Sequence, residues 1–314
     1  MRRPWVVFVV LVFALTLPFT FTAGAQGDIE QSLAKSLAWM LDHNSGVGYR
    51  VADHQWRGTE KFAQRLPNGY SPAQIRHAYG FDEVFTEGDG QIIGIVMFNY
   101  YPTAAADLKQ FIRTFRLRSM YGLPGGGTCS VAYGPHPCFQ VVYAQGSQPA
   151  VDASADFEQA IDIEWAHAIA PGADILLVET ATNAFADMLG GVDRAVNDGA
   201  SVVSMSWGVP EGAPEAVLDH HFNVTGVTFV ASAGDTGNAT VYPAVSPYVL
   251  SVGGTKLQLR GGERIAPETA WSNSGGGISA FEPEPTYQSH FPIPNSGGFR
   301  GNPDVAYDAD PTTG

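Results

Sequence analysis

Two carboxylates spaced four residues apart are the residues of this sequence best placed to do chemistry. Glu158 and Asp162 lie in the segment 157–169, and at about 100° per residue they share a narrow arc of a helix. The same arc holds three apolar residues, Ile161, Trp165 and Ile169. Like-charged, partly desolvated acids about 5–6 Å apart share a proton, because the pKa of at least one of them rises. The pair therefore predicts acid–base chemistry at a buried helix face, although acids at a solvated helix edge would show the same spacing.

A third acid follows a predicted strand. Asp235 lies between glycines in the segment 233–237, directly after an apolar run. Ligands of doubly wound sheets bind outside the carboxyl ends of the strands, so this position suits a functional acid. An Asp in such a setting also forms simple turns. Trp207 and Gly208 follow the apolar run 201–206 in the same way and are equally open to a structural interpretation.

Apolar runs that alternate with helical segments predict the framework that would position these residues. The predicted strands are 92–98, 139–144, 175–178, 201–206, 227–232 and 248–252. The predicted helices lie near 103–116, 154–169, 183–198 and 212–224. This order predicts an α/β fold with a doubly wound, mostly parallel sheet and helices on both faces. From Pro267 onward, Gly, Pro and aromatic residues predict long ordered loops with a few short strands.

The N-terminal residues have the pattern of an export signal. Residues 1–25 contain paired arginines, an apolar stretch and a small-residue cleavage site, as in a secretory signal peptide, and the arginines leave twin-arginine export open. Residues 26–69 predict one helix near 29–43 and a polar connector. No later segment holds the roughly 18 apolar residues of a membrane span. We therefore expect a secreted, extracellular protein without membrane association after signal cleavage.

Charge and cysteine content narrow the possible partners. The formal net charge of −14 and the pI near 4.8 argue against nucleic acid, which requires a basic face. Cys129 and Cys138 flank a Gly- and Pro-rich loop. Because export favours oxidation, we expect one disulfide between them, with a two-cysteine metal site as the alternative.

In this order, the motifs resemble the sedolisin family of serine-carboxyl peptidases. The resemblance begins at 70–79, covers about residues 70–314, and implies one peptidase domain over that range with a subtilisin-like fold. Besides the carboxylate pair, the matching segments are 204–208, 233–237, 242–255, 274–279, 285–288, 300–306 and 309–311.

The resemblance assigns roles to the three acids. It implies that Glu158 is the general base, that Asp162 is the acid that orients it, and that Asp235 stabilises the oxyanion. An ionised carboxylate would repel an oxyanion, so Asp235 must be protonated, which places the chemistry in acid. His167 lies about 180° from Glu158 on the helix, so we expect a surface or structural histidine and not a base.

The resemblance also implies a substrate-binding edge. Ser206, Trp207 and Gly208 would line the cleft where an extended peptide pairs with the backbone. Gly275 and Gly276 would let the backbone approach a ligand closely. A core tryptophan and a plain turn remain the alternatives for these two segments.

Three family features do not appear in the sequence. The family's nucleophilic serine lies in a Gly-Thr-Ser segment downstream of 309–311, and Thr255 of the Gly-Gly-Thr segment 253–255 is followed by Lys256 instead of serine. Calcium is expected from the resemblance, but the family's calcium ligands lie beyond the matched region, so no metal ligand is assigned. Only about 45 residues separate Ala25 from Tyr70, whereas a long prosegment is usual in the family.

Two hypotheses follow. In the first, the sequence represents a secreted serine endopeptidase that hydrolyses polypeptides at acidic pH, with a C-terminally incomplete domain that is itself inactive. In the second, it is a catalytically dead, secreted peptide-binding module. Both bind polypeptides, and for both we expect a monomer.

Overall fold

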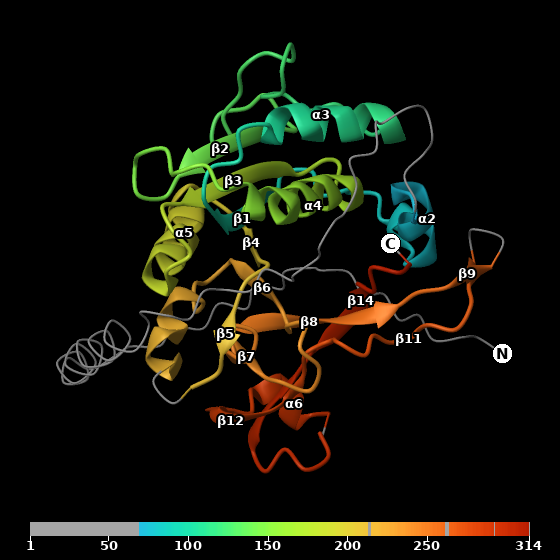
Figure 1. Ribbon diagram of the computed structural model, residues 1–314, viewed down its shortest axis with the longest axis vertical. Coiled ribbons are helices and arrows are strands. Elements are labelled where there is room, and N and C mark those ends of the chain that lie inside the picture. The colour runs from blue at the N-terminus through green and yellow to red at the C-terminus, as the bar shows by residue number, and fades with distance from the viewer. Residues whose placement is uncertain (1–68, 213–214, 261–263, 292, 314) are drawn as a thin grey trace.

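The computed structural model describes residues 69–212, 215–260, 264–291 and 293–313, which are drawn in colour in Figure 1. The expected signal peptide 1–25 and the helix near 29–43 lie outside the described residues. No helix in the described ranges combines the length and the apolar character needed to cross a membrane.

An eight-stranded, mostly parallel sheet forms the centre of the fold (Figure 1). The spatial order is β11-β8-β6-β4-β1-β3-β2, and β14 also pairs with β8. The strands are β1 (Ile92–Phe98), β2 (Phe139–Tyr143), β3 (Asp174–Thr180), β4 (Val202–Met205), β6 (Thr228–Ser232), β8 (Val249–Lys256), β11 (Thr269–Ala270) and β14 (Val305–Asp308). Of these, β11 runs antiparallel to its neighbour and the other pairs are parallel. The predicted mostly parallel sheet is therefore confirmed, although β8 extends four residues beyond its predicted end.

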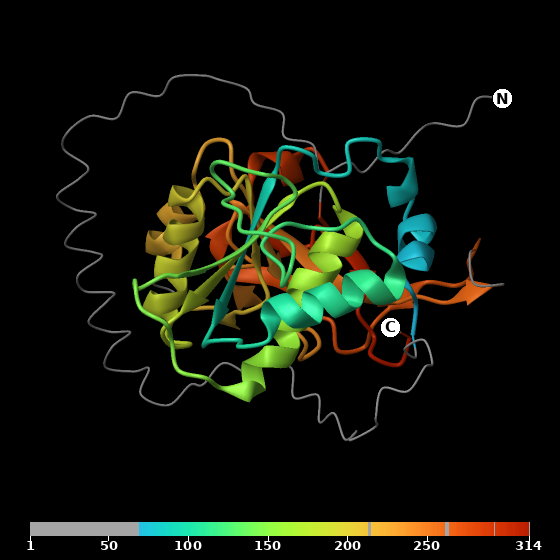
Figure 2. The ribbon, with the colours of Figure 1, turned by 90° about the horizontal axis from the view of Figure 1, so that it is seen from above.

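Helices cover both faces of this sheet. α3 (Ala104–Phe115) and α4 (Ala153–Ile169) lie on one side, and α5 (Phe185–Asn197) lies on the other (Figure 2). Every residue of β3 is buried because the strand is covered from both sides. The shorter elements are α2 (Pro72–Ala78), η1 (Phe81–Glu83), β5 (Val209–Pro210), η2 (Glu215–His221), β7 (Val241–Tyr242), β9 (Leu259–Arg260), β10 (Arg264–Ile265), β12 (Gly277–Pro283), α6 (Thr286–Ser289) and β13 (Phe299–Asn302).

The helix expected near 212–224 is wrong in type and length. The chain forms the 3-10 helix η2 there, which packs against α5. Positions three apart share a face in a 3-10 helix, so Glu215 and Leu218 are both buried.

A buried ion pair holds the C-terminal segment on the sheet. Arg300 is 0% exposed, and its guanidinium donates to both carboxylate oxygens of Asp304, at 2.8 and 2.5 Å. Asp304 also accepts a hydrogen bond from the backbone N–H of Ser251 in β8 (2.8 Å). These contacts join β13 to β8 and fix the chain just before β14.

The expected disulfide between Cys129 and Cys138 is present. It closes the loop that precedes β2, and Cys138 is 0% exposed. The link therefore anchors that loop at the start of β2.

Four acids gather at η2: two belong to η2 itself, one lies shortly before it and one lies in β12. Glu215, Asp219 and Glu282 are between 1% and 9% exposed, and Glu211 lies beside them with one buried oxygen that has no hydrogen-bond partner. Asp219 accepts hydrogen bonds from the hydroxyls of Tyr242 and Ser246, and both carboxyl oxygens of Glu282 are buried next to it. Burial and mutual repulsion raise the pKa of Glu215 and of Glu282 to about 8. These two carboxyls are therefore held in their neutral form in acid.

This cluster predicts a protein that is more stable in acid. The pKa of Glu282 in the folded protein is above its ordinary value of 4.5. The stability that the neutral carboxyl contributes is therefore fully present below pH 4.5 and is lost as the pH rises toward about 8. The free energy of unfolding should fall between acid and about pH 8 in the wild type. In Glu282→Gln, which stays neutral, this fall should be smaller by roughly 2 kcal/mol. Denaturant unfolding across this pH range measures the effect, and Glu284→Gln, two residues further along, is the matched control. Equal slopes for the wild type and Glu282→Gln would contradict the prediction.

Candidate active site

The helix α4, which carries the acid pair, packs on the sheet through a different face from the one predicted. The fully buried residues of α4 are Ala155, Gln159, Ile163, His167 and Ala168. The predicted arc is wrong as a core face, because Ile161 is 37% exposed and the residues at 158, 162 and 165 are only partly buried. Glu158 and Asp162 instead lie at one side of the buried face.

A hydrogen bond joins this helix to the carboxyl end of β4. The hydroxyl of Ser206, the residue directly after β4, donates to Oδ1 of Asp162 at 2.7 Å. Oδ2 of Asp162 is buried and has no hydrogen-bond partner. Ser206 was expected to contribute through its backbone, so its side-chain contact is a feature that the sequence interpretation missed. The available signal was a hydroxyl residue at the end of a predicted strand.

The two acids of α4, Glu158 and Asp162, have raised pKa values and so retain protons at a higher pH than ordinary carboxyl groups do. Burial, followed by repulsion from Asp235, raises the pKa of Glu158 to about 7. Burial, followed by repulsion from Glu158, raises the pKa of Asp162 well above its usual value. A hydrogen bond from Ser206 acts in the opposite direction on both acids. The pair is therefore suited to hold one shared proton while its second group is ionised.

The third acid lies beside this pair. Asp235 follows β6, and its side chain is exposed, so acidic solvent reaches it directly. Its charge acts on Glu158, which places all three carboxyl groups at one edge of the sheet. Asp235 and Ser206 also line a groove of about 250 Å³ that lies over the carboxyl ends of β4 and β6 and beside residues 252–254 in the middle of β8.

Trp207 and Gly208 lie behind the groove surface. Trp207 is 5% exposed, and its indole N–H donates to the carbonyl of Val96 in β1 (2.9 Å). The structure thus uses Trp207 as a core tryptophan, and its side chain does not line the groove. Gly208 lies against the backbone of Tyr242, where a Cβ would approach the carbonyl oxygen to 2.9 Å.

The paired glycines are required by contacts within the chain. The N–H of Gly275 donates to the carbonyl of Gly234 (2.5 Å), and a Cβ at Gly275 would lie 1.9 Å from the carbonyl oxygen of Ala233. Gly276 has φ +154°, and a Cβ there would lie 2.9 Å from Pro303. At Gly275 the close approach is made to the segment that carries Asp235, and at Gly276 it is made to Pro303 and Asn302.

His167 is a structural residue. It is 0% exposed, and its Nε2–H donates to the carbonyl of Arg118 at 2.7 Å. Burial lowers its pKa to about 4, so it is neutral near pH 7. The expectation of a structural histidine therefore agrees with its surroundings, and a surface position is ruled out.

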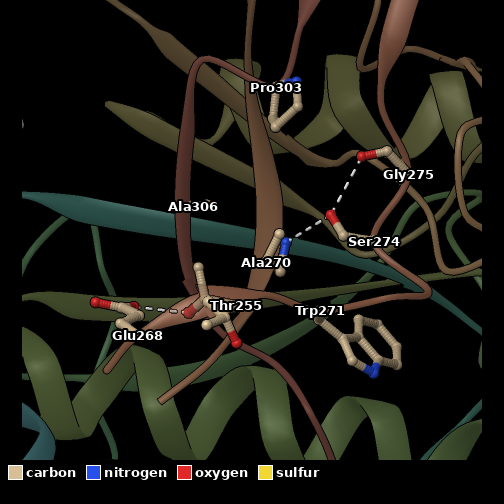
Figure 3. A pocket seen from close by; sticks show the side chains of 10 residues that line it. Thr255, Glu268, Ala270, Trp271, Ser274, Gly275, Pro303 and Ala306 are labelled. Atoms are coloured by element: carbon tan, nitrogen blue, oxygen red, sulfur yellow. Dashed lines mark hydrogen bonds between the residues drawn. The ribbon is translucent and has the colours of Figure 1, made fainter. Parts of the chain in front are cut away.

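A larger cavity, of about 510 Å³, lies next to the groove and shares Gly254 with it. In Figure 3, Glu268 and Ser274 lie on opposite sides of this cavity. Glu268 accepts a hydrogen bond from the Thr255 hydroxyl, and Ser274 accepts one from the N–H of Gly254. None of the three acids at 158, 162 and 235 lines it, so the larger cavity is not where the acid chemistry would take place.

Calcium was expected from the family resemblance. Within the described ranges, no group of three or more His, Cys, Asp or Glu side chains is arranged to hold a metal ion. The residues of this part of the chain therefore do not fit a calcium site, and the ion enters none of the steps considered below.

The arrangement can move protons next to an open groove. A pair that shares one proton can accept a second from an attacking hydroxyl, and a neutral carboxyl can donate a hydrogen bond to a developing oxyanion. The carboxyl group of Asp162 is desolvated next to another acid. We therefore expect the acid pair to reduce the stability of the fold at neutral pH.

Comparison with known proteins identifies relatives of this arrangement. The profile of the subtilase family matches residues 145–306. Kumamolisin from a Bacillus species is 36% identical over 281 residues, which cover 79% of this chain and 47% of kumamolisin. Sedolisin from a Pseudomonas species is 28% identical over 155 residues, which cover 39% of this chain and 26% of sedolisin. The chain thus spans about half the length, or less, of these curated relatives.

A solved structure gives the fold independently. Pseudomonas sedolisin, a serine-carboxyl proteinase complexed with two molecules of pseudo-iodotyrostatin, superposes with a TM-score of 0.63 at 23% identity. The match covers 78% of this chain and 72% of that chain. The subtilisin-like fold expected from the sequence is therefore confirmed.

The buried acid pair predicts a stabilising substitution. Asp162→Asn keeps an acceptor for the Ser206 hydroxyl but removes a desolvated charge that Glu158 repels. It should raise the free energy of unfolding by about 1–2 kcal/mol near pH 8 and by less near pH 4, where the pair retains a proton and the repulsion between the two acids is smaller. Chemical denaturation at both pH values measures this difference. A variant less stable than the wild type at both values would contradict it.

Proposed function

Because this chain belongs to the subtilase family, and within it to the sedolisin peptidases, we propose that it forms part of a secreted serine-carboxyl endopeptidase that hydrolyses polypeptides at acidic pH. The observation that carries the proposal is the gathering of Glu158, Asp162 and Asp235 beside one groove. Substrate would be a polypeptide, and the protein would act as an extracellular monomer.

In this proposal the acid pair is the base of the reaction. Glu158 takes the proton of an attacking serine hydroxyl, and Asp162 keeps Glu158 oriented and shares the proton that the pair already holds. The raised pKa of Glu158, about 7, supports a pair that retains a proton through the acidic range. Above the acidic range, the acid pair loses its last proton. At very low pH the pair holds two protons and can no longer accept the proton of the serine hydroxyl.

Asp235 would stabilise the oxyanion. Its exposed position beside the groove supports contact with a bound peptide, and in its neutral form it could donate to the carbonyl oxygen that gains charge. An ionised Asp235 would repel both the oxyanion and Glu158. The proposed chemistry is therefore confined to acid for two reasons, one at each carboxyl site.

The nucleophile is proposed to be a serine outside these 314 residues, because the sequence contains no Gly-Thr-Ser segment. An extended substrate would pair with the backbone near Ser206, where the groove opens, as peptides do when they add to a strand. Peptide binding without cleavage is the alternative function.

The first test compares this chain with a longer product of the same reading frame that contains a Gly-Thr-Ser serine. The longer protein should cleave an unfolded protein substrate near pH 4 and lose most of this activity near pH 8, whereas the 314-residue chain should not cleave it. Release of peptides is measured across the pH range. Comparable rates near pH 4 and pH 8 would refute the mechanism, and binding without cleavage by the longer protein would favour the peptide-binding alternative.

The second test concerns Asp235. Asp235→Ala should lower the kcat of the longer protein by about 100- to 1,000-fold, the usual effect of removing one oxyanion donor. Asp235→Asn keeps an N–H donor at every pH, so the remaining activity should extend further toward neutral pH than in the wild type. Initial rates of the three proteins across the pH range provide the measurement. An Asp235→Ala variant with wild-type kcat would exclude the proposed role.

A further inference from the structure

Ser206 lies where one hydroxyl can serve two carboxyl groups. It follows β4, faces α4 across the edge of the sheet, and donates to Asp162 Oδ1 at 2.7 Å. Glu158 lies one helical turn before Asp162, and the Ser206 side chain also acts on it as a hydrogen-bond partner. The hydroxyl is therefore within reach of both acids of the pair.

The chemistry of a hydroxyl decides what such a contact can do. Ser206 has one hydrogen to donate and two lone pairs that accept. Donating to two carboxylates at once would require two hydrogens. With one proton on the acid pair, however, all three groups are satisfied, because the protonated acid donates to Oγ and Oγ–H donates to the ionised acid.

We propose that the Ser206 hydroxyl is the bridge of the acid pair: it donates to whichever of Glu158 and Asp162 is ionised and accepts from the one that is protonated. This role rests on the proposed function for its use in catalysis, but the bridge itself is a property of this chain. Ser206 is thus a positioning residue that acts through the two acids, in addition to any backbone contact with substrate.

Two observations favour a bridge over a contact with Asp162 alone. Oδ2 of Asp162 is buried without a partner, so Asp162 depends on Ser206 for the hydrogen bond that compensates its burial. Both acids resist ionisation because of burial, and Ser206 opposes that effect at both positions. Without this hydroxyl, the pair would tend to hold two protons and would have no ionised group to act as a base.

The test is a carboxyl titration of the 314-residue chain by NMR with ¹³C-labelled Asp and Glu side chains. Ser206→Ala should move the titration of both Glu158 and Asp162 upward by about one pKa unit, because a hydrogen bond to the charged forms is lost. Ser206→Thr, which keeps the hydroxyl, should restore wild-type titration. Ser204→Ala is the matched control, since Ser204 lies two residues earlier on the same strand face and lines the same groove.

A second comparison removes the coupling between the acids. In an Asp162→Asn background, Ser206→Ala should still raise the pKa of Glu158, because an ionised Glu158 accepts the Ser206 hydrogen bond more strongly than a neutral amide does. An unchanged Glu158 titration in that background, or an equal shift in Ser204→Ala, would overturn the bridge. Neither measurement uses substrate, so failure of the longer protein to cleave peptides would refute the proposed function and leave this result standing. Near-ultraviolet circular dichroism near pH 4 establishes that each variant is folded.

Discussion

The hydrogen bond between Ser206 and Asp162 is the contact on which the rest of the site depends, because it joins elements far apart in the sequence. Asp162 belongs to a helix on one face of the sheet, and Ser206 belongs to the loop after a central strand. The parallel arrangement of β4 and β6 brings Asp235 to the same edge. Asp235 therefore lines the groove close to Glu158, which in turn lies next to Asp162, because the sheet brings α4 and the loop after β6 together at one edge.

The mostly parallel framework was predicted correctly from the sequence, and the roles of the three acids stay predictions, but the sequence did not predict how α4 lies on the sheet. Hydrophobicity failed there because two buried residues of the helix are polar. Gln159 donates to the carbonyl of Phe98, and His167 donates to that of Arg118, so each has one hydrogen bond to the backbone that offsets part of the cost of its burial. Ile161, by contrast, is 37% exposed. A periodicity that counts only apolar residues therefore points to the wrong side of the helix.

The residues of the expected substrate edge show a second limit. Trp207 and Gly275 were expected at this edge, and their surroundings depend on long-range contacts with Val96 and Ala233. Such contacts join segments that the order of motifs does not relate. The resemblance to a family suggests which positions to inspect, and only the packing distinguishes a residue that lines the groove from one that supports its wall.

The protonated acids beneath η2 have a consequence for where such a protein can persist. Burial of Glu215 and Glu282 is tolerated only while their carboxyl groups are neutral, and the acid pair near the groove also retains protons because it is desolvated. A shift of the surroundings from acid to neutral is therefore expected to destabilise the fold and, under the proposed function, to reduce peptide cleavage as well. A peptidase built in this way would carry its own spatial limit, since material that escapes from an acidic habitat would decay without a dedicated inhibitor.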